Sequence, residues 1–216
     1  IKFKNVIYPN IENEFNIPNT ISIKNNQIIT GPNASGKTTL LKAIIINLLL
    51  SQQTGYGFFE YAKFTPYDNI YCYLNIPDNC SRDSLFQAEA RRCYSILKDI
   101  EDKPDEKHFC VFDELFSGTN PYEAIASAKC YLEYISKNKN ITFLLTTHFD
   151  KLCKLLDKQD NIDNKHMSCE IIDNKPKYYY KIKDGITTVK GGICVLQELN
   201  YPPEIIKNTK KILSQI

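Results

Sequence analysis

The stretch IITGPNASGKTTLLKAIII, which runs from Ile28 to Ile46, decides the fold class of this chain. Its centre fits the pattern G-x-x-x-x-G-K-[ST], after a run rich in β-branched residues and before a segment of helical periodicity. Glycines let such a loop curl so that successive backbone N–H groups point inward, and the N-terminus of a following helix adds positive potential. The stretch therefore predicts a strand, an anion-binding loop and a helix in succession.

The loop predicts a site for the phosphates of a nucleoside triphosphate. Lys37 would reach the β- and γ-phosphates, and the Thr38 hydroxyl would ligate Mg²⁺. The alternative is a glycine turn that fits the pattern by chance, which is disfavoured because a strand is expected before it and a helix after it. The residues expected to contact the nucleotide are Gly31, Pro32, Asn33, Ala34, Ser35, Gly36, Lys37, Thr38 and Thr39.

Two adjacent acids follow a second apolar run, Phe109–Phe112. A buried strand would deliver Asp113 and Glu114 to the edge of the sheet where α/β proteins bind ligands. There Asp113 would hold Mg²⁺ through water, and Glu114 would orient and polarise the attacking water. The alternative, an acidic pair at the N-terminus of a helix, fits less well because the preceding run is typical of a strand.

His148 follows the next expected strand, Ile141–Thr146. A histidine at that edge could contact the γ-phosphate and sense its loss. The alternative is a histidine that is buried in the core with its hydrogen bonds satisfied. Its position directly after a strand favours the functional interpretation.

Expected strands and helices alternate along most of the chain, which predicts an α/β fold with a parallel or mixed sheet covered by helices on both faces. The expected strands are Ile1–Lys4, Ile21–Ile23, Gln27–Thr30, Asn69–Leu74, Phe109–Phe112 and Ile141–Thr146. The expected helices are Thr38–Leu50, Ser84–Ile100 and Tyr122–Lys137.

The last third of the chain is more polar. We expect Lys151–Lys177 to form a long surface loop, and Lys177–Lys183 to pair with Ile186–Val189 in a hairpin closed by Asp184-Gly185. Pro203 suits the first turn of a final helix, in which apolar residues recur at helical spacing as far as Ile216.

Composition sets broad limits. The 216 residues suffice for one domain with its own core, and the formal net charge of +2 is too small to indicate nucleic acid or membrane. No apolar run approaches the ~20 residues of a membrane-spanning helix, and no secretory signal opens the chain. Eight cysteines without a C-x-x-C pair favour reduced thiols over a zinc or disulfide framework. We therefore expect a soluble intracellular protein, of cytoplasm or nucleus, and the start within a strand without Met predicts a domain of a longer chain.

Four stretches, in this order, resemble the ATPase domain of the MutS family of DNA mismatch repair proteins, which belongs to the ABC ATPase class. They are TGPNASGKTT, SLFQAE, FDELFSGTNPYE and TTHFDKL, and they span Thr30 to Leu152. A weaker match continues to the C-terminus through KDG…GG and YPPEIIKNTKKIL. The resemblance implies a P-loop NTPase fold, ATP and Mg²⁺ as ligands, and Lys37, Glu114 and His148 as catalytic residues.

The resemblance also implies a dimer, either a homodimer or a MutS-like heterodimer, that forms through this domain. Residues 1–197 would be the ATPase domain, and residues 198–216 a C-terminal helical segment that helps to join the subunits. Ser84, with Phe86 and Glu89, would reach across the dimer to the γ-phosphate of the other subunit's nucleotide. From the residues alone, Asp83-Ser84 has a second interpretation as the cap of the helix that runs to Ile100.

Further positions take roles from the same resemblance. Phe15 would stack on adenine, and Gly118-Thr119-Asn120 would pass through the dimer interface. The chain departs from the family pattern at Arg82, where glycine is common, and at Ala34-Ser35, which replaces Met-Gly. Phe116 and Ser117 also stand where a small residue and an arginine are typical.

The function implied by the resemblance is ATP hydrolysis that drives a dimer cycle on mismatched or damaged double-stranded DNA, held by modules outside this chain. One alternative keeps the ATPase and changes its use to recombination, chromosome maintenance or ribosome rescue. Another is a nucleotide-binding interaction module that does not hydrolyse ATP. No basic stripe with interleaved aromatic residues points to DNA contact by this segment itself.

Overall fold

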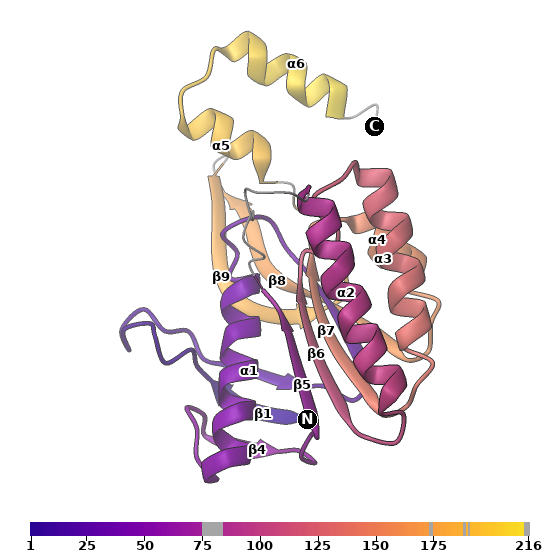
Figure 1. The fold of residues 1–216 in the computed structure, drawn as a ribbon. Helices are drawn as coiled ribbons and strands as arrows, with labels where there is room; N and C mark the ends of the chain where they lie inside the picture. The colour runs from indigo at the N-terminus through magenta and orange to yellow at the C-terminus, as the bar shows by residue number, and fades with distance from the viewer. Residues whose placement is uncertain (75–83, 173–174, 188, 190, 214–216) are drawn as a thin grey trace.

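A six-stranded sheet, in the order β5-β6-β7-β3-β8-β9, forms the centre of the molecule (Figure 1). The computed structural model describes residues 1–74, 84–172, 175–187, 189 and 191–213. The strands are β3 (Asn26–Thr30), β5 (Asn69–Tyr73), β6 (His108–Asp113), β7 (Ile141–Thr147), β8 (Ile162–Ile172) and β9 (Lys175–Asp184). All neighbours pair in parallel except β9, which is antiparallel to β8. The predicted α/β architecture with a mixed, mostly parallel sheet is confirmed.

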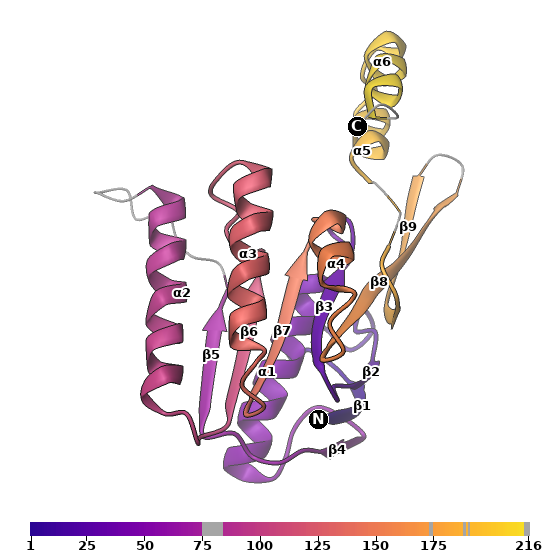
Figure 2. The ribbon, with the colours of Figure 1, turned by 90° about the vertical axis from the view of Figure 1, so that its right-hand side faces the viewer.

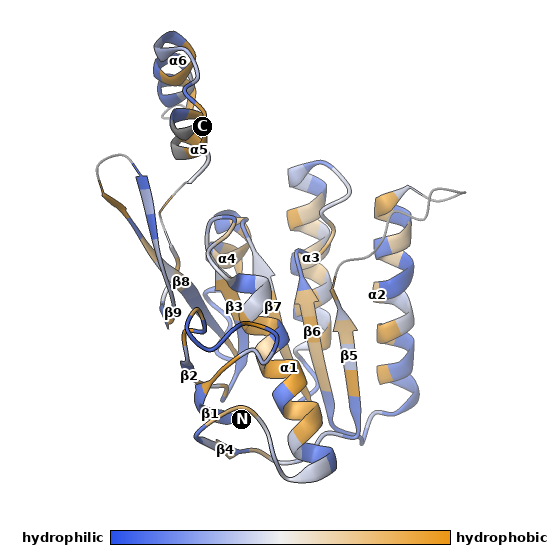
Figure 3. Cartoon of the chain, turned by 90° about the vertical axis from the view of Figure 1, so that its left-hand side faces the viewer, coloured by the Kyte–Doolittle hydropathy of each residue, from blue (hydrophilic) through white to orange (hydrophobic). Residues whose placement is uncertain are grey.

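Helices cover both faces of this sheet. One face carries α1 (Lys37–Thr54), and the other carries α2 (Leu85–Asp102), α3 (Pro121–Ile135) and α4 (Asp150–Leu156), as Figure 2 shows. Strand β6 serves both layers, because alternate residues of a strand point to opposite faces. Phe109 and Val111 pack in the cluster that includes α1, whereas Cys110 and Phe112 pack in the cluster of α2, α3 and α4. The apolar runs of the sequence thus become central strands that are buried on both sides (Figure 3).

A small antiparallel sheet lies beside α1. Its strand order is β2-β1-β4, with β1 at Lys2–Val6, β2 at Asn19–Ser22 and β4 at Tyr61–Lys63. Phe3 and Val6 are buried in the same cluster as α1. Strands were expected near β1 and β2, and β4 was not predicted.

Two helices end the described chain. Helix α5 (Gly192–Glu198) and helix α6 (Pro203–Leu213) lie together beyond one end of the six-stranded sheet, where α5 contacts β9 (Figures 1 and 2). Helix α6 starts at the proline that suggested it, and α5 was not predicted. None of the described residues of α6 is buried. Among the described residues, no helix has the length and apolar character needed to span a membrane.

The prediction of a long surface loop at Lys151–Lys177 is wrong, because this segment contains most of α4 and all of β8. Strand β8 pairs with β3 over Asn26–Thr30 and lies inside the sheet. Side chains of its polar first half find charged partners in the folded chain. Asn164 Nδ2 donates to Asp157 Oδ1 at 2.8 Å, and the Lys165 ammonium pairs with the Asp184 carboxylate.

The prediction of a hairpin between Lys177–Lys183 and Ile186–Val189 is also wrong. The whole of Lys175–Asp184 is one strand, β9, and it pairs backwards with β8. Residues 173–174, which separate the two strands in the sequence, fall outside the described residues. Asp184-Gly185 therefore ends the pairing instead of closing a hairpin.

Candidate active site

The glycine loop lies between the carboxyl end of β3 and the first turn of α1. Strand β3 is buried along its whole length, so Thr30 delivers the loop at the edge of the sheet. Gly36 caps α1 with φ at 92°, in the left-handed region that L-residues with a side chain rarely adopt. A Cβ atom there would also stand 3.1 Å from the Tyr180 ring. The second glycine of the pattern is thus required by the backbone.

Lys37 folds back over this loop. Its Nζ donates to the carbonyl oxygens of Gly31 at 2.9 Å and Pro32 at 3.3 Å, and it lies 3.9 Å from Glu114 Oε1. The side chain is only 6% exposed. Burial lowers the pKa of Lys37 below its ordinary value, and the carboxylates of Glu114 and Asp113 oppose that shift. A cation that is desolvated in this way is suited to bind an anion such as a phosphate.

Asp113 and Thr38 meet at the end of β6. Thr38 Oγ1 donates to Asp113 Oδ2 at 2.8 Å, and the hydroxyl of Thr146 donates to the other carboxylate oxygen. Strand β7 lies between β6 and β3, and in this register Asp113 stands opposite Thr146. A hydroxyl beside a carboxylate provides the hard oxygen ligands that Mg²⁺ prefers. The two residues predicted to hold Mg²⁺ therefore fit that ion.

Glu114 is held in a strained conformation, with φ at 54°. Its backbone N–H donates to the Thr146 carbonyl at 3.0 Å, and its Oε1 lies 3.5 Å from His148 Nδ1. The hydrogen bond with His148 is the main cause that lowers the pKa of Glu114 below its ordinary value, against the opposing effect of burial. His148 is 47% exposed, so the alternative of a buried core histidine does not hold.

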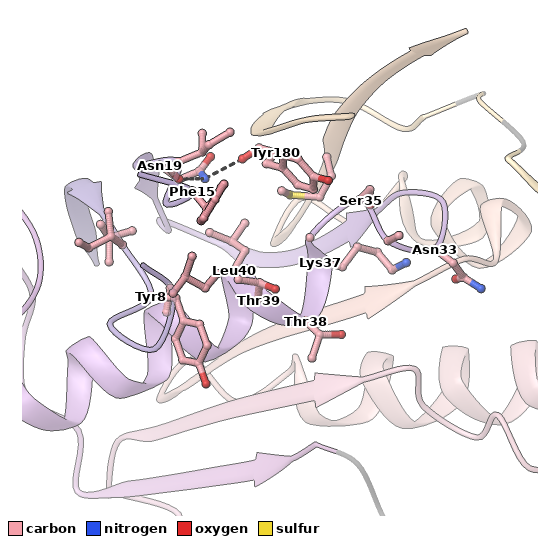
Figure 4. A pocket seen from close by; sticks show the side chains of 18 of the residues that line it. Tyr8, Phe15, Asn19, Asn33, Ser35, Lys37, Thr38, Thr39, Leu40 and Tyr180 are labelled. Carbon is pink, nitrogen blue, oxygen red and sulfur yellow. Dashed lines mark hydrogen bonds between the residues drawn. The ribbon is translucent and has the colours of Figure 1, made fainter. Parts of the chain in front are cut away.

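A cavity of about 720 Å³ opens beside the loop (Figure 4). The predicted residues from Asn33 to Thr39 line it, together with Phe15 and Glu114. Gly31 and Pro32 line a neighbouring cavity of about 380 Å³, which also contains His148. The structure therefore gathers the predicted loop residues, the acid Glu114 and the aromatic Phe15 around two cavities that share Asn33 and Glu114 in their lining.

Part of the wall of the larger cavity was not predicted from the sequence. Tyr8, Ile17, Met167 and Tyr180 also line the larger cavity. They come from the segment between β1 and β2 and from the strands β8 and β9, which do not belong to any short motif. Only a correct pairing of β9 with β8 would have placed Tyr180 beside the loop.

Ser84 lies apart from these residues. It is exposed and caps α2, because its hydroxyl accepts from Gln87 N at 3.3 Å while the Gln87 side chain accepts from Ser84 N at 2.9 Å. Ser84 is not among the residues that line the cavities beside the glycine loop. The cap expected from the sequence is confirmed for Ser84, Asp83 falls outside the described residues, and the role across a dimer stays a prediction.

The model of the family MutS domain V matches residues 27–216 of the chain. The chain belongs to the MutS family. The DNA mismatch repair protein MutS of Streptococcus uberis is 28% identical over 204 residues, which cover 93% of this chain and 24% of that protein. Human MutS protein homolog 4 is 32% identical over 197 residues, which cover 88% of this chain and 20% of that protein.

A third relative, the DNA mismatch repair protein MutS of Finegoldia magna, is 31% identical over 191 residues, or 88% of this chain and 22% of that protein. The chain thus spans about a quarter or less of the length of these curated relatives.

Proposed function

We propose that this MutS-family chain binds ATP together with Mg²⁺ and hydrolyses the ATP, as an ABC-class P-loop ATPase domain. The observation that carries this proposal is the meeting of four predicted side chains at one edge of the sheet. Thr38 Oγ1 lies 2.8 Å from Asp113 Oδ2, and Lys37 Nζ lies 3.9 Å from Glu114 Oε1. A buried cation, a pair of metal ligands and a second acid are the groups that phosphoryl transfer to water requires.

Each of these groups has a part in the proposed reaction. Lys37 and the backbone N–H groups of the loop bind the phosphates, and the resemblance to the MutS family places Asn33 beside the γ-phosphate. Thr38 and Asp113 hold Mg²⁺, which supplies neutralisation of the phosphate charge when it is bound. Glu114 orients and polarises the attacking water as a carboxylate, and His148 senses the γ-phosphate next to it.

The wall of the large cavity contains an aromatic residue that suits the binding of the adenine base. Phe15 is 68% exposed although it lines this cavity, so an apolar ring faces open space beside the phosphate loop. Aromatic faces stack on nucleobases. Phe15 therefore stacks on adenine in the proposed complex.

The wider function rests on the family. Two of the relatives named above are DNA mismatch repair proteins, so we extend the proposal to a dimer, homomeric or heteromeric, that closes on ATP and opens on hydrolysis, with Ser84 reaching the nucleotide of the other subunit. Modules outside this chain would hold mismatched or damaged double-stranded DNA. Leu199, Ile205 and Ile212 are exposed apolar residues in or beside α6, and such a surface suits a dimer contact.

The experiment that tests hydrolysis compares wild type with Glu114→Gln. The amide keeps the shape of the side chain but loses its charge, so we expect turnover to fall by about 100-fold or more while ATP still binds. Steady-state phosphate release and calorimetric ATP titration measure the two quantities. Glu106→Gln, an exposed acid at the opposite end of β6, is the control and should behave as wild type. Unchanged turnover in Glu114→Gln would refute the proposed water activation, and ATP binding without any turnover in wild type would leave a binding module.

A further inference from the structure

Glu89 is a buried carboxylate that accepts three hydrogen bonds from one loop. It lies on the second turn of α2 and is 2% exposed. Its Oε1 accepts from Ser117 N at 3.1 Å and from Ser117 Oγ at 2.9 Å, and its Oε2 accepts from Gly118 N at 3.0 Å. A buried carboxylate is tolerated only where such donors surround it. The arrangement ties α2 to the segment that directly follows the two acids.

This segment needs support to keep its shape. Glu114 and Phe116 both have positive φ, at 54° and 58°, although neither is glycine. Such conformations persist only where the surrounding structure holds them in place. Phe116 is buried, and its ring lies 5.9 Å from that of Phe86 on α2. The charged hydrogen bonds of Glu89 and this ring contact together hold the segment against the helix.

The backbones of the helix and the loop also meet directly. A Cβ atom on Gly118 would stand 2.6 Å from the backbone nitrogen of Phe86 and 2.8 Å from the Leu85 side chain. Only glycine therefore allows the loop to approach the first turn of α2 this closely. A shift of this turn toward the loop must therefore move the loop as well.

The same contact borders the candidate active site. A cavity of about 410 Å³ lies between the candidate active site and the contact of α2 with the loop. Residues from both line it: Asn33, Thr38, Tyr73, Leu85, Glu89, Asp113, Glu114 and Ser117. Glu89 is linked to the segment of Glu114 through the loop, because Ser117 and Gly118, which donate to Glu89, follow Glu114 closely in the chain.

We propose that Glu89 is a positioning residue that fixes Glu114 for water activation, and that it thereby couples the start of α2 to hydrolysis in the same subunit. This inference rests on the proposed ATPase function. Helix α2 begins at Ser84, where that function places the nucleotide of a second subunit. A nucleotide that shifts Ser84 would then shift Glu114 through Glu89, so one site would regulate the other.

The test is Glu89→Gln in the intact protein. Glutamine keeps the size of the side chain, but its NH₂ group is a donor and would face one of the loop N–H donors. We expect kcat to fall about tenfold or more, because a hydrogen bond to a charged group is lost. The Kd for ATP should stay within about twofold, because the glycine loop is untouched. Ser117→Ala removes only the hydroxyl donor and should lower kcat by a smaller factor.

The matched control is Ile96→Val, which trims a buried side chain on the same helix away from the loop. It should lower the thermal midpoint and leave kcat unchanged.

A kcat of wild-type size in Glu89→Gln, beside a slow Glu114→Gln, would overturn the inference and leave the proposed function intact. A loss of ATP affinity as large as the loss of kcat would overturn it as well. If Glu89→Gln does not fold, an unchanged kcat in Ser117→Ala overturns the inference, and a lowered kcat supports it. A wild-type protein without ATP turnover would instead refute the proposed function.

Discussion

Replacement of Lys37 by methionine isolates the contribution of one buried cation to ATP binding. Methionine keeps an unbranched apolar stem close to that of lysine and removes the ammonium with its charge and its N–H donors, so it leaves no large void near the loop. In the structure, the Nζ atom of Lys37 donates hydrogen bonds to the carbonyl oxygens of Gly31 and Pro32, at 2.9 and 3.3 Å. In the proposed complex a phosphate oxygen takes over part of that coordination.

The magnitude follows from the charges at the site. Two unit charges about 4 Å apart interact by about 4 kcal/mol at the effective dielectric constant of a partly buried pair. The exchange of the two carbonyl hydrogen bonds opposes this gain, since hydrogen bonds to charged groups contribute about 1.5–3 kcal/mol. Subtraction of about 2 kcal/mol for this exchange leaves a net loss of about 2 kcal/mol in Lys37→Met, which raises the Kd for ATP by roughly 30-fold.

The unliganded variant should remain at least as stable as wild type. Burial places the pKa of Lys37 below its ordinary value in the folded chain, so the fold binds that proton less firmly than the unfolded chain does. The free energy of unfolding therefore rises with pH between the lowered pKa and the ordinary value. Below that window the buried charge opposes folding, and methionine removes this opposition.

Isothermal titration with ATP and Mg²⁺ at neutral pH measures the affinity, and a thermal melt checks the fold. Lys42→Met is the matched control, because Lys42 lies on α1 and does not line the cavities beside the loop. It should leave the Kd unchanged. A folded Lys37→Met protein whose Kd lies within about threefold of wild type would refute the assignment of Lys37 to the phosphates.

Two further predictions concern the neighbours of the loop. His148→Ala removes the main cause of the lowered pKa of Glu114, so this pKa rises and the acid limb of the kcat–pH profile moves to higher pH. His148→Gln, which can still donate a hydrogen bond, is its control, and an unmoved acid limb in the alanine variant would contradict the link. Phe15→Ala should weaken ATP binding by roughly 5- to 100-fold, because a base stacked on an aromatic ring contributes about 1–3 kcal/mol. Binding of inorganic tripolyphosphate should not change, and an equal loss for both ligands would argue against stacking.

The parts of the fold that sequence patterns predicted are those whose signal is local. Strand β3, the glycine loop and α1 follow one another without a gap, and β6 reads as a continuous apolar run because it is buried on both faces. Strand β8 carries no such signal. Among its polar residues, Asn164 donates to Asp157 through Nδ2 and Lys165 pairs with Asp184, and these partners are brought near by the folded chain. A strand stabilised in this way resembles a loop when its sequence is considered alone.

The candidate site likewise contains some residues that could be predicted from the sequence and others that could not. The residues of the loop and the two acids could be named from the sequence, because glycine spacing and a strand that ends in acids have direct chemical consequences. The aromatic wall at Tyr8 and Tyr180 could not, because it depends on the path of a loop and on the pairing of β9. The role of Glu89 could not be predicted either, since its three donors lie 28 and 29 residues further along the chain.

Strand β7 explains why segments so far apart in the sequence form one site. It lies between β6 and β3, so it sets the distance between the acids and the glycine loop. Its Thr146 holds Asp113 with a hydroxyl and Glu114 with a carbonyl, and its Thr147 stands opposite Thr30 at the start of the loop. Because side chains alternate along a strand, a slip of one residue would turn the Thr146 hydroxyl to the other face of the sheet. The register of this central strand, fixed by the apolar residues buried on both of its faces, therefore determines whether Thr38 meets Asp113 at all.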